Sequence, residues 1–97
     1  EVFGPVLPVA TVSGFDEALA LANNSRYGLG ASVWTRNADL IARATEELEA
    51  GIVWVNQHLK IPPEVPFGGT KESGIGRENG SRALEEYMED QAVLIRL

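Results

Sequence analysis

The stretch PFGGTKESGIGRENG, residues 66–80, combines glycines with cationic and acidic side chains and is the first candidate for phosphate binding. A P-loop places a lysine and a hydroxyl residue directly after its last glycine, but here Gly74 is followed by Ile75 and Gly76. A dinucleotide fingerprint that starts at Gly74 has Asn79 at its third glycine position, and prolines break the segment before it. Both nucleotide patterns fail, which leaves a compact loop whose glycines permit positive φ angles and close backbone approach.

No complete catalytic set accompanies this loop. The only histidine, His58, lies in a proline-rich segment, and the chain has neither a Gly-x-Ser-x-Gly elbow nor a spaced set of zinc ligands. The adjacent acids Glu46 and Glu47, like Glu85 and Glu86, point in different directions on a helix, which predicts solvated faces and not acid–base catalysis. The sequence therefore predicts no metal site and no active site built from these residues alone.

Composition is that of one small globular chain. The 97 residues are 44% hydrophobic and 23% charged, with a formal net charge of -6 and no membrane-spanning run. The acidic balance, without a basic stripe, argues against nucleic acid and anionic membranes as partners. Without cysteine there is no disulfide or thiolate nucleophile, and no secretory signal is visible, so we expect a cytoplasmic protein. The chain begins on EVFGPV without methionine and reads as a piece of something longer.

Apolar runs rich in β-branched residues predict strands. Three of them precede the proline-rich segment: Val6–Val12, Leu29–Thr35 and Gly51–Asn56. Pro8 removes one backbone donor from the first run, which favours an edge or irregular strand. Trp34 and Trp54 lie in the second and third runs, and we expect both in the core.

The segments between these runs place apolar residues at i, i+3, i+4 and i+7, the spacing of an amphipathic helix. The first segment follows Ser13, which resembles a capping box with Asp16, and the second follows a cap at Asn37 and ends at a C-cap on Gly51. Strands alternating with helices predict a right-handed, parallel β-α-β-α-β core of the α/β class.

The remainder of the chain begins with a long connection after Asn56, QHLKIPPEVPFGG, whose length and position after a strand are typical of functional loops. A last helix is expected over 80–88. The final stretch QAVLIRL, residues 91–97, predicts a strand that is apolar on both faces, and we expect it to pair with another chain. Completion of this chain's own sheet is the alternative.

Three stretches together, EVFGPV at 1–6, GIVWVN at 51–56 and PFGGTKESGIGRE at 66–78, resemble in order and spacing the last part of NAD(P)-dependent aldehyde dehydrogenases. The resemblance runs over essentially the whole chain. It implies that residues 1–90 form the C-terminal part of the catalytic domain and residues 91–97 an oligomerisation strand that joins a neighbouring subunit. It also implies that the glycine-rich loop shapes the floor of the active site and does not hold the cofactor's pyrophosphate.

By resemblance, Glu1 matches the glutamate that accepts hydrogen bonds from the nicotinamide ribose, and Phe3 matches the aromatic residue beside the nicotinamide ring. An ionised carboxylate has two acceptor oxygens for a vicinal diol, which fits the first role. The resemblance places four residues around the aldehyde entrance tunnel: Gln57, His58, Ile61 and Phe67. Asn56 is interpreted as a structural hydrogen-bonding residue, and Lys71 and Arg77 as charges that anchor the loop.

The family's reaction needs a cysteine thiolate, a general-base glutamate and a nucleotide-binding domain, and this sequence does not supply them. The resemblance therefore implies an intact oxidoreductase that converts an aldehyde to a carboxylic acid with NAD or NADP. It also implies that this segment alone is inactive and binds no cofactor. The aldehyde and the choice between NAD and NADP stay open. A free-standing structural or oligomerisation module without catalytic activity is the alternative.

Overall fold

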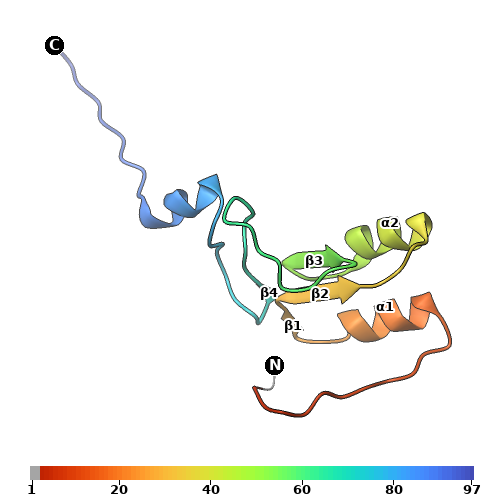
Figure 1. The fold of residues 1–97 in the computed structure, drawn as a ribbon. Coiled ribbons are helices and arrows are strands. Elements are labelled where there is room, and N and C mark those ends of the chain that lie inside the picture. Colours follow the sequence, from red (N-terminus) through yellow and green to blue (C-terminus); the bar gives the residue numbers. More distant parts are fainter. Residues whose placement is uncertain (1–2) are drawn as a thin grey trace.

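The computed structural model describes residues 3–97, and Glu1 and Val2 lie outside the described residues. Figure 1 shows the order of the elements. The helices are α1 (Phe15–Asn23), α2 (Ala38–Glu47) and the 3₁₀-helix η1 (Ser81–Tyr87), and the strands are β1 (Tyr27–Gly28), β2 (Gly30–Val33), β3 (Ile52–Val55) and β4 (Thr70–Lys71). This mixture of helices and small sheets belongs to the α/β class, as the sequence predicted.

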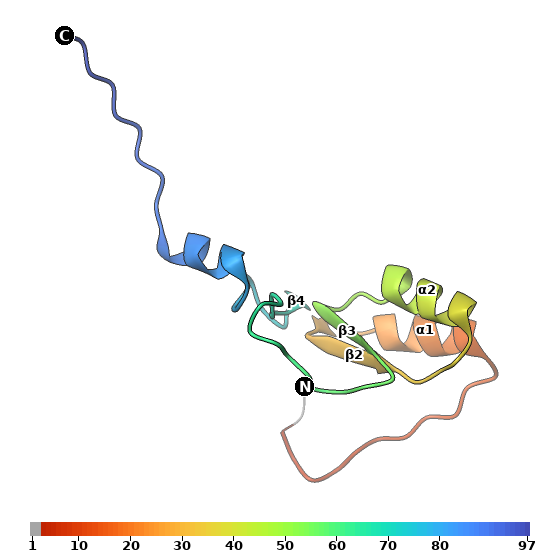
Figure 2. The same cartoon turned by 45° about the horizontal axis from the view of Figure 1, so that its top comes forward.

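The centre of the fold is a β-α-β unit formed by β2, α2 and β3. The two strands pair in parallel, with Gly30 beside Ile52 and Val33 beside Val55. Parallel neighbours need a crossover connection, which α2 supplies. α1 packs against α2, and Figure 2 shows the two helices side by side next to the strand pair. This unit holds the carboxyl ends of β2 and β3 at one edge, where the long loop begins.

The two helices begin in different ways. The Asn37 side chain accepts hydrogen bonds from two amides in the first turn of α2, so the predicted N-cap is confirmed. At α1 the N-cap is Gly14, and Glu17 instead of Asp16 occupies the third helical position. Ser13 therefore donates its amide and hydroxyl to Glu17, at 2.7 and 2.6 Å, and the predicted pairing with Asp16 is wrong. The hydroxyl bond, more than the amide bond, holds the pKa of Glu17 below its ordinary value.

Gly51 is not the C-cap that the sequence predicted for α2. The C-cap is Leu48, and the Gly51 amide instead donates to the Gly28 carbonyl at 3.0 Å. A Cβ at Gly51 would overlap the carbonyl oxygen of Gly68. Glycine is required here because the glycine-rich loop lies directly against the start of β3.

Two predicted strands, Val6–Val12 and Gln91–Leu97, are not strands in the structure. Both segments are exposed, and neither pairs with another segment among residues 3–97. Figure 1 shows the C-terminal segment running away from the rest of the chain. A strand needs a partner for its backbone groups, and Pro8 removes a donor as well, so apolar composition alone does not make one. The described residues therefore contain one parallel β-α-β unit and not the whole predicted β-α-β-α-β core.

The C-terminal half differs from prediction in two further ways. β1 and β4 form an antiparallel pair, with Tyr27 beside Lys71, that the sequence did not predict. The last helix, expected over 80–88, is the 3₁₀-helix η1, in which no residue is buried. A helix without a packed face lacks the tertiary contacts that stabilise most α-helices.

The core is small. Among the described residues, the buried hydrophobic side chains are Leu19, Ala44 and Trp54, which confirms the prediction for Trp54. Trp34 lies just beyond Val33, the last residue of β2, and is 67% exposed, so the prediction that it is a core residue is wrong. Within residues 3–97 no helix is both long enough and apolar enough to cross a membrane.

Candidate functional site

The loop after β3 starts with a constrained residue. Asn56 has a φ angle of 53°, in the left-handed region. Its side chain accepts a hydrogen bond from the Thr35 amide at 2.9 Å and donates one to the Thr35 carbonyl at 2.8 Å. Such a conformation persists in a non-glycine residue where its surroundings support it. Asn56 therefore has the structural hydrogen-bonding role that the sequence predicted.

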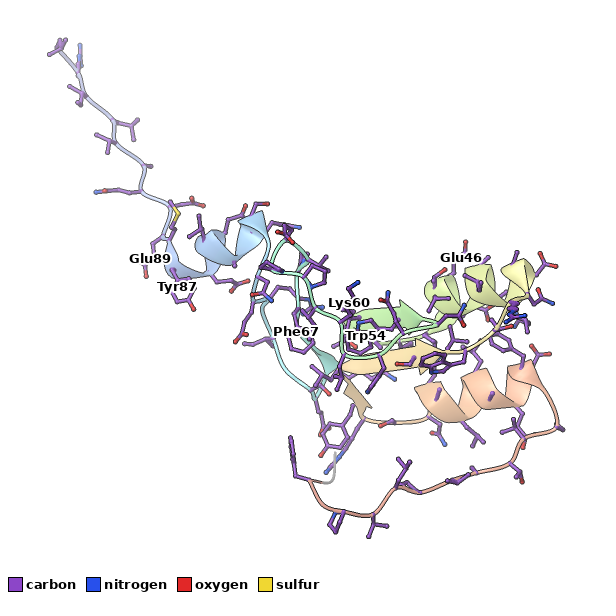
Figure 3. All side chains as sticks on the ribbon, in the orientation of Figure 1. Glu46, Trp54, Lys60, Phe67, Tyr87 and Glu89 are labelled. Carbon is purple, nitrogen blue, oxygen red and sulfur yellow. The ribbon has the colours of Figure 1, made fainter. Side chains whose placement is uncertain are left out.

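Trp54 and His58 hold the first turn of this loop, residues 57–67. The indole Nε1 of Trp54 donates to the Lys60 carbonyl at 2.8 Å, and the two residues lie together in Figure 3. The His58 ring meets Trp54 edge-on, with centroids 5.3 Å apart and planes inclined by 69°. Nδ1 of His58 lies 2.6 Å from the hydroxyl oxygen of Ser32. In the part of the chain that the structure describes, no group of three or more His, Cys, Asp or Glu could hold a metal ion.

Main-chain bonds hold the other end of the 57–67 loop. Phe67 and Glu78 form an antiparallel bridge in which each amide donates to the other's carbonyl at 2.7 Å. The Gly80 amide donates to the Pro63 carbonyl at 2.9 Å. The Phe67 backbone is therefore fixed against the glycine-rich loop, residues 66–80.

Lys71 anchors the glycine-rich loop to α1. Its ammonium donates to the carbonyls of Asn23 and Ser25, at 2.8 and 3.1 Å, and pairs with the Glu49 carboxylate. Asn23 is the last residue of α1, where helical carbonyls lack intrahelical partners. A cation at this position also complements the negative end of the helix dipole. These contacts confirm the anchoring role that the sequence predicted for Lys71.

Arg77 folds the same loop onto itself. Its Nη1 donates to the carbonyls of Gly69 and Gly76, at 2.8 and 2.7 Å. Thr70, in β4, holds the loop against β1, because its hydroxyl donates to the Gly28 carbonyl at 3.1 Å. Arg77 therefore also anchors the loop, as predicted, and its guanidinium is used for main-chain contacts.

A pocket of about 700 Å³ lies between the end of α1, the two sheets and the 57–67 loop. Seven aromatic or large aliphatic residues contribute to its wall: Phe3, Tyr27, Leu29, Leu48, Trp54, Leu59 and Phe67. His58 adds a polar ring, and Glu49 is the one carboxylate among the described lining residues. No lysine or arginine of the described residues lines it. The pocket is therefore suited to an uncharged, mainly apolar group.

The structure brings three of the predicted site residues to this pocket: Phe3, His58 and Phe67. Gln57 and Ile61, expected at the aldehyde tunnel, do not line it, and Glu1 lies outside the described residues. Sequence reasoning missed Tyr27 and Leu59. Tyr27 could have been found in the sequence as an aromatic residue directly after the stretch NNSR, which ends the helix. Leu59 could have been found as the neighbour of His58.

The lining of the pocket does not suit the phosphates of a nucleotide. A pyrophosphate is held by cationic side chains or by the N-terminus of a helix. Here the helix end at the pocket is the C-terminus of α1, represented by Ala22 and Asn23, whose dipole end is negative. The aromatic side chains of Phe3 and Phe67 suit a planar or apolar group.

The fold and the pocket define a class of structure, an α/β domain portion in which an anchored glycine-rich loop and an aromatic pocket meet at the edge of a β-α-β unit. The family model described as the aldehyde dehydrogenase family matches residues 1–93, and the chain belongs to this family. The family resemblance that the three sequence stretches carry is thereby confirmed.

Individual relatives match nearly the whole chain. Phenylacetaldehyde dehydrogenase of Pseudomonas fluorescens is 50% identical over 95 residues, which are 98% of this chain and 19% of that protein. Aldehyde dehydrogenase B of Escherichia coli is 46% identical over the same shares of the two chains, 98% and 19%. The structure of the P. syringae indole-3-acetaldehyde dehydrogenase AldA with NAD+ and IAA is similar, with a TM-score of 0.88 and 42% identity over 97% of this chain and 19% of that one. The chain spans about a fifth of the length of these relatives.

Proposed function

We propose that this chain is the C-terminal segment of an NAD(P)-dependent aldehyde dehydrogenase, whose intact form oxidises an aldehyde to a carboxylic acid. The observation that carries the proposal is the family match over residues 1–93, combined with coverage of 19% of the phenylacetaldehyde dehydrogenase. The P. syringae relative was solved with NAD+, which supports a nicotinamide cofactor for the intact protein.

In this proposal, residues 1–90 complete the catalytic domain and supply one wall of the active site. Phe3 and Phe67 lie far apart in the sequence and line the same pocket, which supports a shared role. An apolar wall beside the nicotinamide ring limits water at the place of hydride transfer. The cofactor supplies the hydride acceptor when bound. Glu1 is proposed to accept hydrogen bonds from the ribose hydroxyls and so to fix the position of that ring.

The chemistry of the family uses a cysteine thiolate, and this chain contains no cysteine. We therefore expect the 97-residue chain alone to oxidise no aldehyde. We also expect no saturable NAD binding, because one carboxylate and one aromatic ring do not offset the entropy lost on binding a dinucleotide. Calorimetry with millimolar NAD tests this expectation, and a defined one-to-one isotherm would refute it.

We further propose that the two exposed extended segments find partners outside this chain. Val6–Val12 would join the parallel core of the intact catalytic domain, and Gln91–Leu97 would pair with a neighbouring subunit to make a homo-oligomer. The exposure of their apolar side chains supports this proposal, since Val9 is 86% exposed and Leu94 is 93% exposed.

The test of the function uses the full-length protein and the Glu1→Gln variant. The wild type is expected to oxidise aldehydes with NAD or NADP. Glu1→Gln keeps the shape and weakens the acceptors, so hydride transfer should slow by about tenfold, the effect of about 1.4 kcal/mol. Acylation of the catalytic thiol without cofactor should survive. Glu46→Gln is the matched control, because Glu46 is exposed on α2.

Two results would oppose the proposal at different levels. Unchanged turnover and cofactor affinity in Glu1→Gln would remove the ribose-binding role from Glu1 and leave the enzyme class intact. A full-length wild type that oxidises no aldehyde with either cofactor would refute the enzyme class and favour a structural module.

A further inference from the structure

One face of the β2–β3 pair carries a set of side-chain contacts that the proposed chemistry does not use. Ser32 and Trp54 are register partners in the parallel pair, and their side chains therefore lie on the same face. His58 folds back over this face. Its Nδ1 lies 2.6 Å from the Ser32 hydroxyl oxygen, and its ring and the Trp54 ring form a T-shaped pair with centroids 5.3 Å apart. We name Ser32, Trp54 and His58 the loop lock.

The loop lock holds a turn that is unfavourable by itself. Leu59 lies between His58 and Lys60 with a φ angle of 55°, a left-handed conformation that costs free energy for a residue with a side chain. Ser32 fixes the residue before Leu59, and the Trp54 indole fixes the residue after it by donating to the Lys60 carbonyl at 2.8 Å. The turn is therefore clamped on both sides of its strained residue.

The strained residue is the one that reaches the pocket. Leu59 and His58 both line the pocket, whereas Ser32 and Lys60 do not. Leu59 is 67% exposed, so few packing contacts of its own side chain keep it in place. Its position in the pocket wall consequently depends on the two clamps.

We propose that Ser32 is a positioning residue of the aldehyde pocket, acting through His58 to hold Leu59 in the pocket wall. The identity of the ligand as an aldehyde rests on the proposed function, while the positioning rests on the contacts of the loop lock. Removing the Ser32 hydroxyl leaves the Trp54 to Lys60 bond in place, so one clamp opens and the β-α-β unit is kept. The effect should fall on aldehydes large enough to reach Leu59 and should spare small ones.

The experiment compares Ser32→Ala and Ser32→Thr in the full-length enzyme, with Ser81→Ala as the matched control on exposed η1. Ser32→Ala should raise the KM for phenylacetaldehyde by about three- to tenfold, the value of one net hydrogen bond, with kcat and the KM for the cofactor unchanged. The KM for acetaldehyde should stay constant. Hydrogen exchange of the amides in residues 57–61 should become faster. Ser32→Thr keeps a hydroxyl and should restore both readouts.

Other outcomes would contradict the positioning role of Ser32. If the KM for phenylacetaldehyde and the exchange of residues 57–61 are unchanged in Ser32→Ala, the positioning role is wrong. Equal losses with both aldehydes and a lower thermal midpoint would show general destabilisation and would also overturn it. If the wild type oxidises no aldehyde, the proposed function is wrong. The positioning role is then tested by hydrogen exchange alone, and it is wrong if Ser32→Ala leaves the exchange of residues 57–61 unchanged.

Discussion

Replacing Lys71 with methionine should release the glycine-rich loop from α1. The Lys71 side chain is 26% exposed, and its ammonium contacts the Asn23 and Ser25 carbonyls at 2.8 and 3.1 Å together with the Glu49 carboxylate. Methionine has a similar length and keeps the apolar stem, so Lys71→Met removes the charge and the donors while changing the packing little.

The size of the effect follows from the number of lost bonds and from their exposure. A hydrogen bond to a charged group contributes about 1.5–3 kcal/mol, and an exposed ion pair adds about 0–1 kcal/mol. The two carbonyls can be rehydrated once the loop opens, since Asn23 and Ser25 are not buried. We therefore expect local opening of the loop to become easier by about 2 kcal/mol, which is about thirtyfold in the opening equilibrium.

Native-state hydrogen exchange in the full-length enzyme measures this opening directly. The informative amides are those of Glu72, which donates to the Arg26 carbonyl at 2.9 Å, and Ser73, which donates to the Thr70 carbonyl at 3.1 Å. Their exchange should accelerate by about thirtyfold in Lys71→Met. Lys60→Met is the control, because Lys60 is exposed and its ammonium forms no ion pair within residues 3–97. Equal protection of these amides in wild type and Lys71→Met would refute the anchoring argument.

The pKa of Glu17 is lowered, so its hydrogen bonds with Ser13 stabilise α1 at pH values above the unfolded-state pKa. This stabilisation is lost as the pH falls through the folded-state pKa. Ser13→Ala should therefore raise the midpoint of the Glu17 carboxyl in an NMR titration. Gly51→Ala should destabilise the full-length enzyme by about 1–3 kcal/mol in denaturant melts through overlap with the glycine-rich loop, whereas Gly14→Ala, with open space around its Cβ, should be well tolerated. Truncation after Asp90 should reduce self-association in sedimentation equilibrium, and an unchanged oligomer would rule out the terminal strand as the interface.

The β-α-β unit could be predicted because its signals are local. Apolar spacing identified α1 and α2, and β-branched runs identified β2 and β3. The β1–β4 pair could not be predicted in the same way, since two-residue strands carry no alternation. It is held by side chains from distant positions, such as the Thr70 hydroxyl that donates to Gly28 and the Lys71 ammonium that donates to Asn23. The sequence shows these residues but not which carbonyls they reach.

The candidate site was predictable where one stretch carries both the residue and its anchor. Phe67 belongs to the glycine-rich motif, and its backbone is fixed by a bridge to Glu78 in that same motif. Leu59 is different, because its place in the pocket depends on a strained turn clamped by Ser32 and Trp54 from two strands. Contacts of that kind arise only after the strands have paired, so the composition of the loop does not report them.

The predictions that relied on apolar composition have one physical limit. Trp34 was assigned to the core and Val6–Val12 to a strand because they are apolar, and both are exposed in the structure. Gln91–Leu97, which we expect to pair with another chain, is exposed as well. An apolar pattern indicates that moving a side chain out of water lowers the free energy. It does not identify the surface that buries the side chain. With a core limited to Leu19, Ala44 and Trp54 among the described residues, most of that apolar surface has no partner within them. These exposed apolar segments are therefore the parts of the chain where we expect contacts with the rest of the enzyme and with other subunits.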